Sequence, residues 1–170
     1  MDTSNAYFIT QTLKPDYYKF KMKNQLFKTY PLIWTILKKH CKTITLIPEL
    51  TGNANIHYHG LIFFTDSFLR KYEGKLDTMK KFIKNKFRTI GFTDISKVKN
   101  YNAVLDYILK NIKETAKLLL DTRITVEYLF KSNDSMVTEK IKKILDKEPA
   151  PPEYRIQISN EKFREILFKD

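Results

Sequence analysis

The stretch Ile56-His57-Tyr58-His59-Gly60-Leu61-Ile62-Phe63-Phe64 opens with two histidines and continues as an apolar, β-prone run. In a β-strand the side chains of residues i and i+2 point to the same face. His57 and His59 are therefore expected to present two imidazoles side by side. The wholly apolar end of the run predicts a central strand that is buried on both faces, while its histidine end is open to solvent or substrate.

A second β-prone run, residues 43–50, precedes this strand, and residues 51–55 read as the turn between them. If the hairpin turns around Asn53, Glu49 lies directly opposite His57, and cross-strand partners share a face. A slip of one residue would send Glu49 to the other face. With the expected register, two imidazoles and a carboxylate converge on one open patch, which suits a divalent cation.

The chain up to residue 112 alternates strands and helices. Further strands are expected at residues 7–13 and 91–98, and helices at 16–29, 32–40, 77–89 and 101–112. The first two helices are expected to be separate, because Pro31 disfavours helix at Tyr30. The order predicts an α+β fold: a ferredoxin-like, split βαβ antiparallel sheet with helices packed on one side.

Composition favours a nucleic-acid partner. The formal net charge is +12 over 170 residues, which favours a polyanion. The chain also has 12 Phe and 10 Tyr, whose rings can stack on bases. A single cysteine, Cys41, excludes an internal disulfide and a cysteine-based zinc site. The four glycines do not form a nucleotide-binding loop, so we expect no ATPase motor of that type.

The N-terminus lacks a signal pattern and no apolar run has the length of a membrane span, so we expect an intracellular protein without a membrane partner.

A tyrosine stands apart on the helix expected at residues 101–112. Its apolar face consists of Val104, Leu105, Ile108, Leu109 and Ile112. Tyr107 lies at the edge of this face and Lys110, three residues later, is its neighbour. A tyrosine that merely fills the core is expected inside the apolar face, so the position of Tyr107 indicates a function.

These motifs resemble those of the HUH endonuclease superfamily. His57-Tyr58-His59 resembles its His-hydrophobe-His motif, and Tyr107-Ile108-Leu109-Lys110 resembles its Tyr-x-x-Lys motif, in the same order. Phe8-Ile9-Thr10-Gln11-Thr12-Leu13 is loosely similar to the first-strand motif of replication initiator (Rep) proteins of small circular single-stranded DNA viruses and plasmids. The resemblance covers residues 6–113. It implies a nicking domain at 1–113 and leaves 114–170 as a helical or mixed extension of unknown role. Within this extension the sequence pattern predicts a basic amphipathic helix at 137–147, a short strand at 154–158 and a last helix that Ser159 could cap and that ends at Phe168.

The resemblance implies a rolling-circle initiator that nicks and rejoins single-stranded DNA at an origin sequence or stem-loop. Glu49, His57 and His59 would hold Mg²⁺ or Mn²⁺, and Tyr107 would form a covalent 5′-phosphotyrosine with Lys110 beside the phosphate. Phe8, Thr10 and Thr12 are candidate DNA contacts. A separate helicase and a host polymerase are possible partners, in a bacterial or archaeal cytoplasm or, for a eukaryotic virus, in the host nucleus.

Other interpretations remain open. An HUH single-strand transposase or a conjugative relaxase would use the same chemistry, although relaxases usually gather three histidines and this sequence offers two near the site. A non-catalytic, RRM-like nucleic-acid-binding module would use the same architecture. Two nearby histidines are also often ordinary surface residues, and a helical tyrosine is usually a packing residue. A second tyrosine, Tyr101, falls on a different helix face from Tyr107, so a single-tyrosine enzyme is expected.

Overall fold

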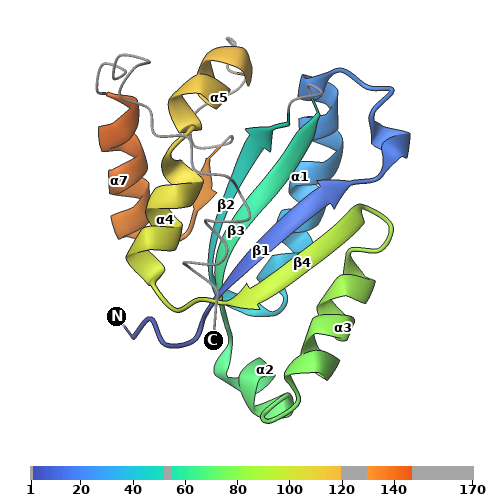
Figure 1. The fold of residues 1–170 in the computed structure, drawn as a ribbon, viewed down its shortest axis with the longest axis vertical. Coiled ribbons are helices and arrows are strands. Elements are labelled where there is room, and N and C mark those ends of the chain that lie inside the picture. Colours follow the sequence, from blue (N-terminus) through green and yellow to red (C-terminus); the bar gives the residue numbers. More distant parts are fainter. Residues whose placement is uncertain (1, 52–54, 120–129, 147–170) are drawn as a thin grey trace.

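The computed structural model describes residues 2–51, 55–119 and 130–146. They form an α+β fold around a five-stranded antiparallel sheet in the order β4-β1-β3-β2-β5 (Figure 1). The first four strands are β1 (Ala6–Leu13), β2 (Cys41–Leu50), β3 (Ile56–Phe64) and β4 (Gly91–Lys97). Their order is the one expected for a ferredoxin-like arrangement, and β3 lies at the centre as predicted.

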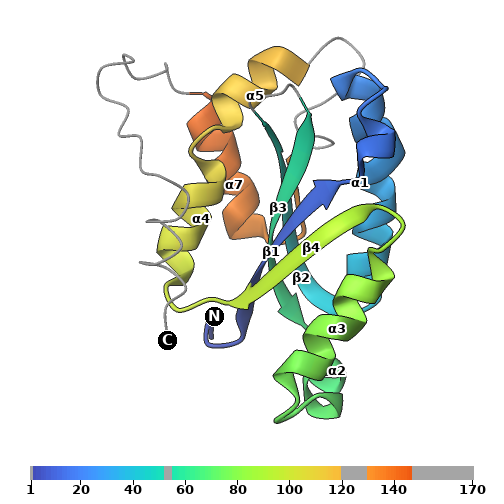
Figure 2. The same cartoon turned by 45° about the vertical axis from the view of Figure 1, so that its right-hand side comes forward.

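One face of the sheet is covered by α1 (Met22–Lys38) and by α3 (Leu76–Lys86), as Figure 2 shows. The hydroxyl of Tyr30 on α1 donates to the carbonyl oxygen of Leu46 at 2.8 Å, and Thr29 Oγ1 is hydrogen-bonded to Tyr58 Oη at 2.7 Å. Both partners are on strands at the middle of the sheet. These buried polar contacts fix α1 against β2 and β3 beyond what apolar packing alone specifies.

The predicted break at Pro31 is wrong. Helix α1 runs through Pro31, after only a short 3₁₀ turn at Pro15–Tyr17. A proline inside a helix removes one backbone hydrogen bond and crowds the preceding turn. Here the residues just before it, Thr29 and Tyr30, are tied to the sheet by the hydrogen bonds above, while Pro31 itself is exposed. Tertiary contacts therefore override the local preference.

The other face is covered by α4 (Tyr101–Leu109), so helices lie on both faces and not on one as predicted. The ring of Tyr101 packs against Phe63, with centroids 5.8 Å apart. The reason lies in β3, whose residues Leu61 to Phe64 are all buried. A strand that is apolar on both faces needs cover on both. Of the helices α1, α3 and α4, only α1 and α3 share one face of the sheet as predicted.

The helix expected at residues 101–112 is two helices. Lys110 caps the end of α4, and α5 (Ile112–Leu119) begins two residues later. A short helix that the sequence prediction missed, α2 (Asp66–Lys71), precedes α3, and the Thr65 side chain caps it by accepting from the Phe68 backbone N–H.

Beyond residue 129, β5 (Lys131–Ser132) adds to the sheet edge beside β2, and α7 (Ser135–Leu145) follows as the basic amphipathic helix expected there. Lys140 on α7 pairs with Asp106 on α4 at 2.6 Å, so this part of the chain contacts the helix of Tyr107. The strand expected at 154–158 and the last helix lie outside the described residues. None of the helices in the described residues combines the length and the hydrophobicity of a membrane span.

Candidate metal centre and tyrosine

The hairpin register places Glu49 opposite His57, as predicted. The pairing continues to Leu50 and Ile56, and the Thr51 N–H then donates to the Asn55 carbonyl oxygen at 2.8 Å. The turn at Asn53 itself lies outside the described residues. With this register, Glu49 and His57 share a face, and His59 joins them because it follows two residues after His57.

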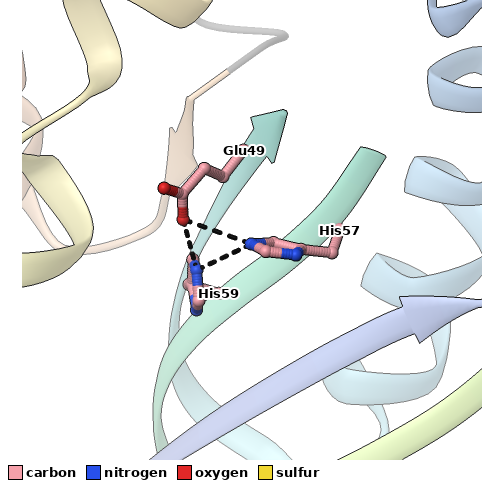
Figure 3. Close-up of side chains that lie close together, drawn as sticks. All are labelled: Glu49, His57 and His59. Carbon is pink, nitrogen blue, oxygen red and sulfur yellow. Dashed lines mark hydrogen bonds and ion pairs between the residues drawn. The ribbon is translucent and has the colours of Figure 1, made fainter. Parts of the chain in front are cut away.

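Three side-chain atoms converge at this point, as Figure 3 shows. His57 Nε2 lies 3.2 Å from Glu49 Oε2 and 3.0 Å from His59 Nε2, and His59 Nε2 lies 2.5 Å from the same carboxylate oxygen. No assignment of protons makes all three contacts favourable, since each imidazole nitrogen either donates or accepts. If both donate to Glu49, the two N–H groups face each other. If His57 donates to His59, then His59 turns a lone pair toward the carboxylate.

A cation in the middle of the three atoms would resolve this conflict by accepting a lone pair from each. An octahedral ion bound at about 2.1 Å holds neighbouring ligand atoms about 3.0 Å apart. The three contacts in the structure bracket that spacing. The three residues therefore fit a divalent ion, and their nitrogen and oxygen donors are compatible with Mn²⁺ or Mg²⁺.

Hydrogen bonding favours an ionised Glu49 at the centre, and burial favours a neutral His59. Burial opposes ionisation of Glu49, but hydrogen bonds from His57, His59 and Asn111 outweigh it and hold the pKa of Glu49 well below its ordinary value. Burial lowers the pKa of His59, against the opposing effect of Glu49. A neutral imidazole beside an anionic carboxylate is the protonation state in which both groups bind metal.

His59 is oriented by aromatic packing. Its ring stacks on Phe8, with centroids 5.4 Å apart, and its Nδ1 is buried without a hydrogen-bond partner among the described residues. Metal-binding histidines usually donate their second nitrogen to an oxygen acceptor, so this one departs from the common pattern. Phe8 is 2 % exposed and is therefore a packing residue beneath the site. Thr10 and Thr12, paired with His59 and His57, are partly exposed on the same face.

Tyr107 lies beside the three ligands. Its ring centroid is 5.6 Å from that of His59 and 6.3 Å from that of Phe8. Lys110 Nζ lies 4.5 Å from the centre of the Tyr107 ring. The helix is placed by its start, where the Asn100 side chain accepts from the Ala103 N–H. The five residues that the sequence singled out for metal binding and catalysis thus lie in one cluster: Glu49, His57, His59, Tyr107 and Lys110.

Sequence reasoning missed Asn111. Its Nδ2 donates to Glu49 Oε1 at 3.0 Å, which leaves Oε2 turned to the histidines. Asn111 follows Tyr107 by four residues, at the junction of α4 and α5. The spacing of four residues was only a weak indication that Asn111 lies on the side of Tyr107, because residues four apart share one side of a helix. The other tyrosine of this helix, Tyr101, packs on Phe63 away from the cluster.

The chain matches none of the family models, curated proteins or solved structures with which it was compared.

Proposed function

We propose that this protein is an HUH-type endonuclease that nicks and rejoins single-stranded DNA and acts as a rolling-circle replication initiator. The observation that carries the proposal is the convergence of Glu49, His57 and His59, whose ligand atoms all lie within 4.8 Å of one another, beside a tyrosine and a lysine. The ferredoxin-like strand order and the basic, aromatic-rich composition support the same proposal.

The chemistry requires a phosphodiester within reach of Tyr107. Its phenol oxygen attacks phosphorus, the P–O3′ bond breaks, and the 3′-oxygen leaves as a hydroxyl that carries the proton the phenol gives up. The product is a 5′-phosphotyrosine, which keeps a phosphodiester that a later 3′-hydroxyl can attack to rejoin the strand. A bound Mn²⁺ or Mg²⁺ would supply Lewis-acid polarisation of a non-bridging oxygen.

Lys110 has two effects in this proposal. A phenol with an ordinary pKa of about 10 is protonated at neutral pH, so a nearby cation is needed to favour the phenolate. The ammonium lies near the Tyr107 ring and can also contact a phosphate oxygen. Lys110 caps the C-terminal end of α4, where the helix dipole favours a positive charge.

The third histidine bears on the relaxase alternative. His40 packs against Phe68 and Phe82, with centroids 5.3 Å from each ring. It is thus part of a separate aromatic cluster, and the candidate metal centre has two histidines among the described residues. This favours a two-histidine initiator over a three-histidine relaxase. The transposase alternative shares the tyrosine helix, and a preference for hairpin substrates would favour it.

The test is a covalent adduct on a denaturing gel. The protein is incubated with Mn²⁺ and a labelled single-stranded oligonucleotide carrying the origin stem-loop of its replicon. We expect a labelled protein band that requires Mn²⁺ and is lost in Tyr107→Phe. Tyr101→Phe is the matched control, since it removes a hydroxyl from the same helix, and it should keep the band. A band of full strength in Tyr107→Phe would exclude this tyrosine as the nucleophile.

A further inference from the structure

The row of paired residues through the candidate metal centre continues to the open edge of the sheet. His57 on β3 pairs with Glu49 of β2 on one side and with Thr12 of β1 on the other. Thr12 pairs in turn with Phe92 on the edge strand β4. Paired residues share a face, so this row crosses four strands on the face of the site. At a strand spacing of about 4.8 Å, Phe92 lies about 10 Å from His57.

Phe92 is 75 % exposed, although it is a large apolar side chain. Single exposed apolar residues are common on protein surfaces, so exposure alone indicates little. Phe92 differs from such residues in its position, because it lies at the end of the row of paired residues that contains two of the proposed metal ligands. An exposed ring on a sheet is the element on which single-stranded nucleic acids stack their bases.

A basic pocket adjoins Phe92. It has a volume of about 510 Å³ and is lined by Lys14, Lys84, Asn85, Arg88, Gly91, Phe92 and Thr93. Three lining residues are cationic and none is acidic. None of the three cations forms an ion pair with an acidic residue in the described parts of the chain. A second pocket of similar size, near α2, includes Glu73 beside its cations and lacks this one-sided charge.

The backbone holds the pocket together. The Lys14 N–H donates to the Ile90 carbonyl oxygen at 2.9 Å, which joins the end of β1 to the chain leading into β4. At Gly91 a Cβ atom would lie 1.9 Å from the Thr12 carbonyl oxygen, so only glycine permits this approach. The close approach brings Lys14 to the same pocket as Lys84 and Arg88.

We infer that Lys14, Lys84, Arg88 and Phe92 form a second DNA-contact site, the edge site, for nucleotides that flank the one at the metal centre. The three cations contact backbone phosphates and Phe92 stacks on a base. The inference rests on the proposed function, which names single-stranded DNA as the substrate.

The test measures binding of fluorescein-labelled oligo(dT) by anisotropy, in EDTA and over a series of salt concentrations. Removing three phosphate contacts in Lys14→Ala/Lys84→Ala/Arg88→Ala should reduce the slope of log K against log [salt] by about 2, since each contact with a single strand contributes about 0.7. Lys86→Ala is the matched control. It removes one positive charge from α3, as Lys84→Ala alone does, but its Nζ lies over the Phe82 ring and outside the pocket, so it should leave the slope unchanged.

Phe92 is tested separately. Phe92→Ala and Phe92→Leu should each weaken oligo(dT) binding by about 5- to 150-fold, as expected for loss of one stacked base, while Phe92→Trp should retain it. Wild-type affinity in Phe92→Ala together with an unchanged salt slope in the triple variant would overturn the edge site. Tighter binding of oligo(rU) than of oligo(dT) would overturn its assignment to DNA.

The two proposals fail in distinguishable ways. The binding assay contains no metal and requires no covalent step. If Tyr107 forms no adduct but binding depends on the edge site, the nicking function is wrong and the edge site stands. If the adduct forms but the four substitutions change neither the affinity for oligo(dT) nor its salt dependence, the edge site is wrong and the nicking function stands.

Discussion

Asn111 Nδ2 donates a hydrogen bond to Glu49 Oε1 at 3.0 Å and thereby connects the tyrosine helix to the proposed metal ligands. Because Asn111 holds one carboxylate oxygen, the other is presented to His57 and His59. A residue that orients a ligand in this way acts through it, and such contacts typically affect metal affinity or activity by about 10- to 100-fold. The bond also ties the position of Tyr107, four residues earlier, to that of Glu49.

Asn111→Ala should therefore weaken Mn²⁺ binding by about 10- to 100-fold, measured by calorimetry, and reduce adduct formation to a similar extent. Asn102→Ala is the control, since Asn102 is exposed on α4 and forms none of the contacts described for the cluster. Asn111→Gln, which keeps the donor, should restore part of the affinity. Equal Mn²⁺ affinities for Asn111→Ala and the wild type would show that this hydrogen bond does not orient the carboxylate.

Gly60, next to His59 on β3, is expected to tolerate no side chain. A Cβ atom there would lie 2.4 Å from Ile9 Cγ2, and Ile9 is fully buried. Gly60→Ala should lower the free energy of unfolding by about 1–3 kcal/mol through overpacking, measured by urea denaturation. The double variant Gly60→Ala/Ile9→Ala should lose less free energy of unfolding than the two single variants together, because the truncated Ile9 side chain makes room for the new Cβ. Simple additivity would mean that the strain is relieved elsewhere.

Pro31 is a site where a single change should stabilise the protein. It lies inside α1 and is exposed, so Pro31→Ala removes a helix-interior proline without opening a cavity. The free energy of unfolding should rise by about 1–3 kcal/mol, since proline costs about 3 kcal/mol in a helix interior and returns part of this by restricting the unfolded chain. Thr35→Ala, exposed on the same helix, serves as the control. A decrease in Pro31→Ala would show that the helix requires the proline.

His40 predicts a pH dependence of stability. Burial and the charges of Lys86, Lys39 and Lys71 hold the pKa of His40 below its ordinary value of 6.5. The unfolded chain therefore takes up the proton at a higher pH than the folded one. Stability is fully present above pH 6.5 and decreases as the pH falls from there toward the folded pKa. Urea denaturation at pH 7.5 and pH 5.5 should show a smaller loss in His40→Gln than in the wild type, whereas equal losses would contradict the assignment.

The sequence predicted strands β1 to β4 and the ligand register for local reasons. The alternation in β3 and the length of the turn were sufficient to place Glu49 opposite His57. Pro31 and the second helix layer were mispredicted because both depend on distant contacts: Tyr30 with Leu46, and Tyr101 with Phe63. Asn111 was missed for the same reason, because its hydrogen bond to Glu49 joins residues that are far apart in the chain.

The central claim is that Tyr107 becomes covalently linked to DNA under the control of the Glu49–His57–His59 centre. The most direct measurement is mass spectrometry of the Mn²⁺-dependent adduct after digestion with trypsin and nuclease. Cleavage after Lys99 and Lys110 yields a peptide with both Tyr101 and Tyr107, so fragment ions must separate them. We predict that a nucleotide is linked through its 5′-phosphate to Tyr107, and that this modification is absent from the double variant His57→Ala/His59→Ala. A modified residue other than Tyr107, or an adduct that persists in that double variant, would contradict the account.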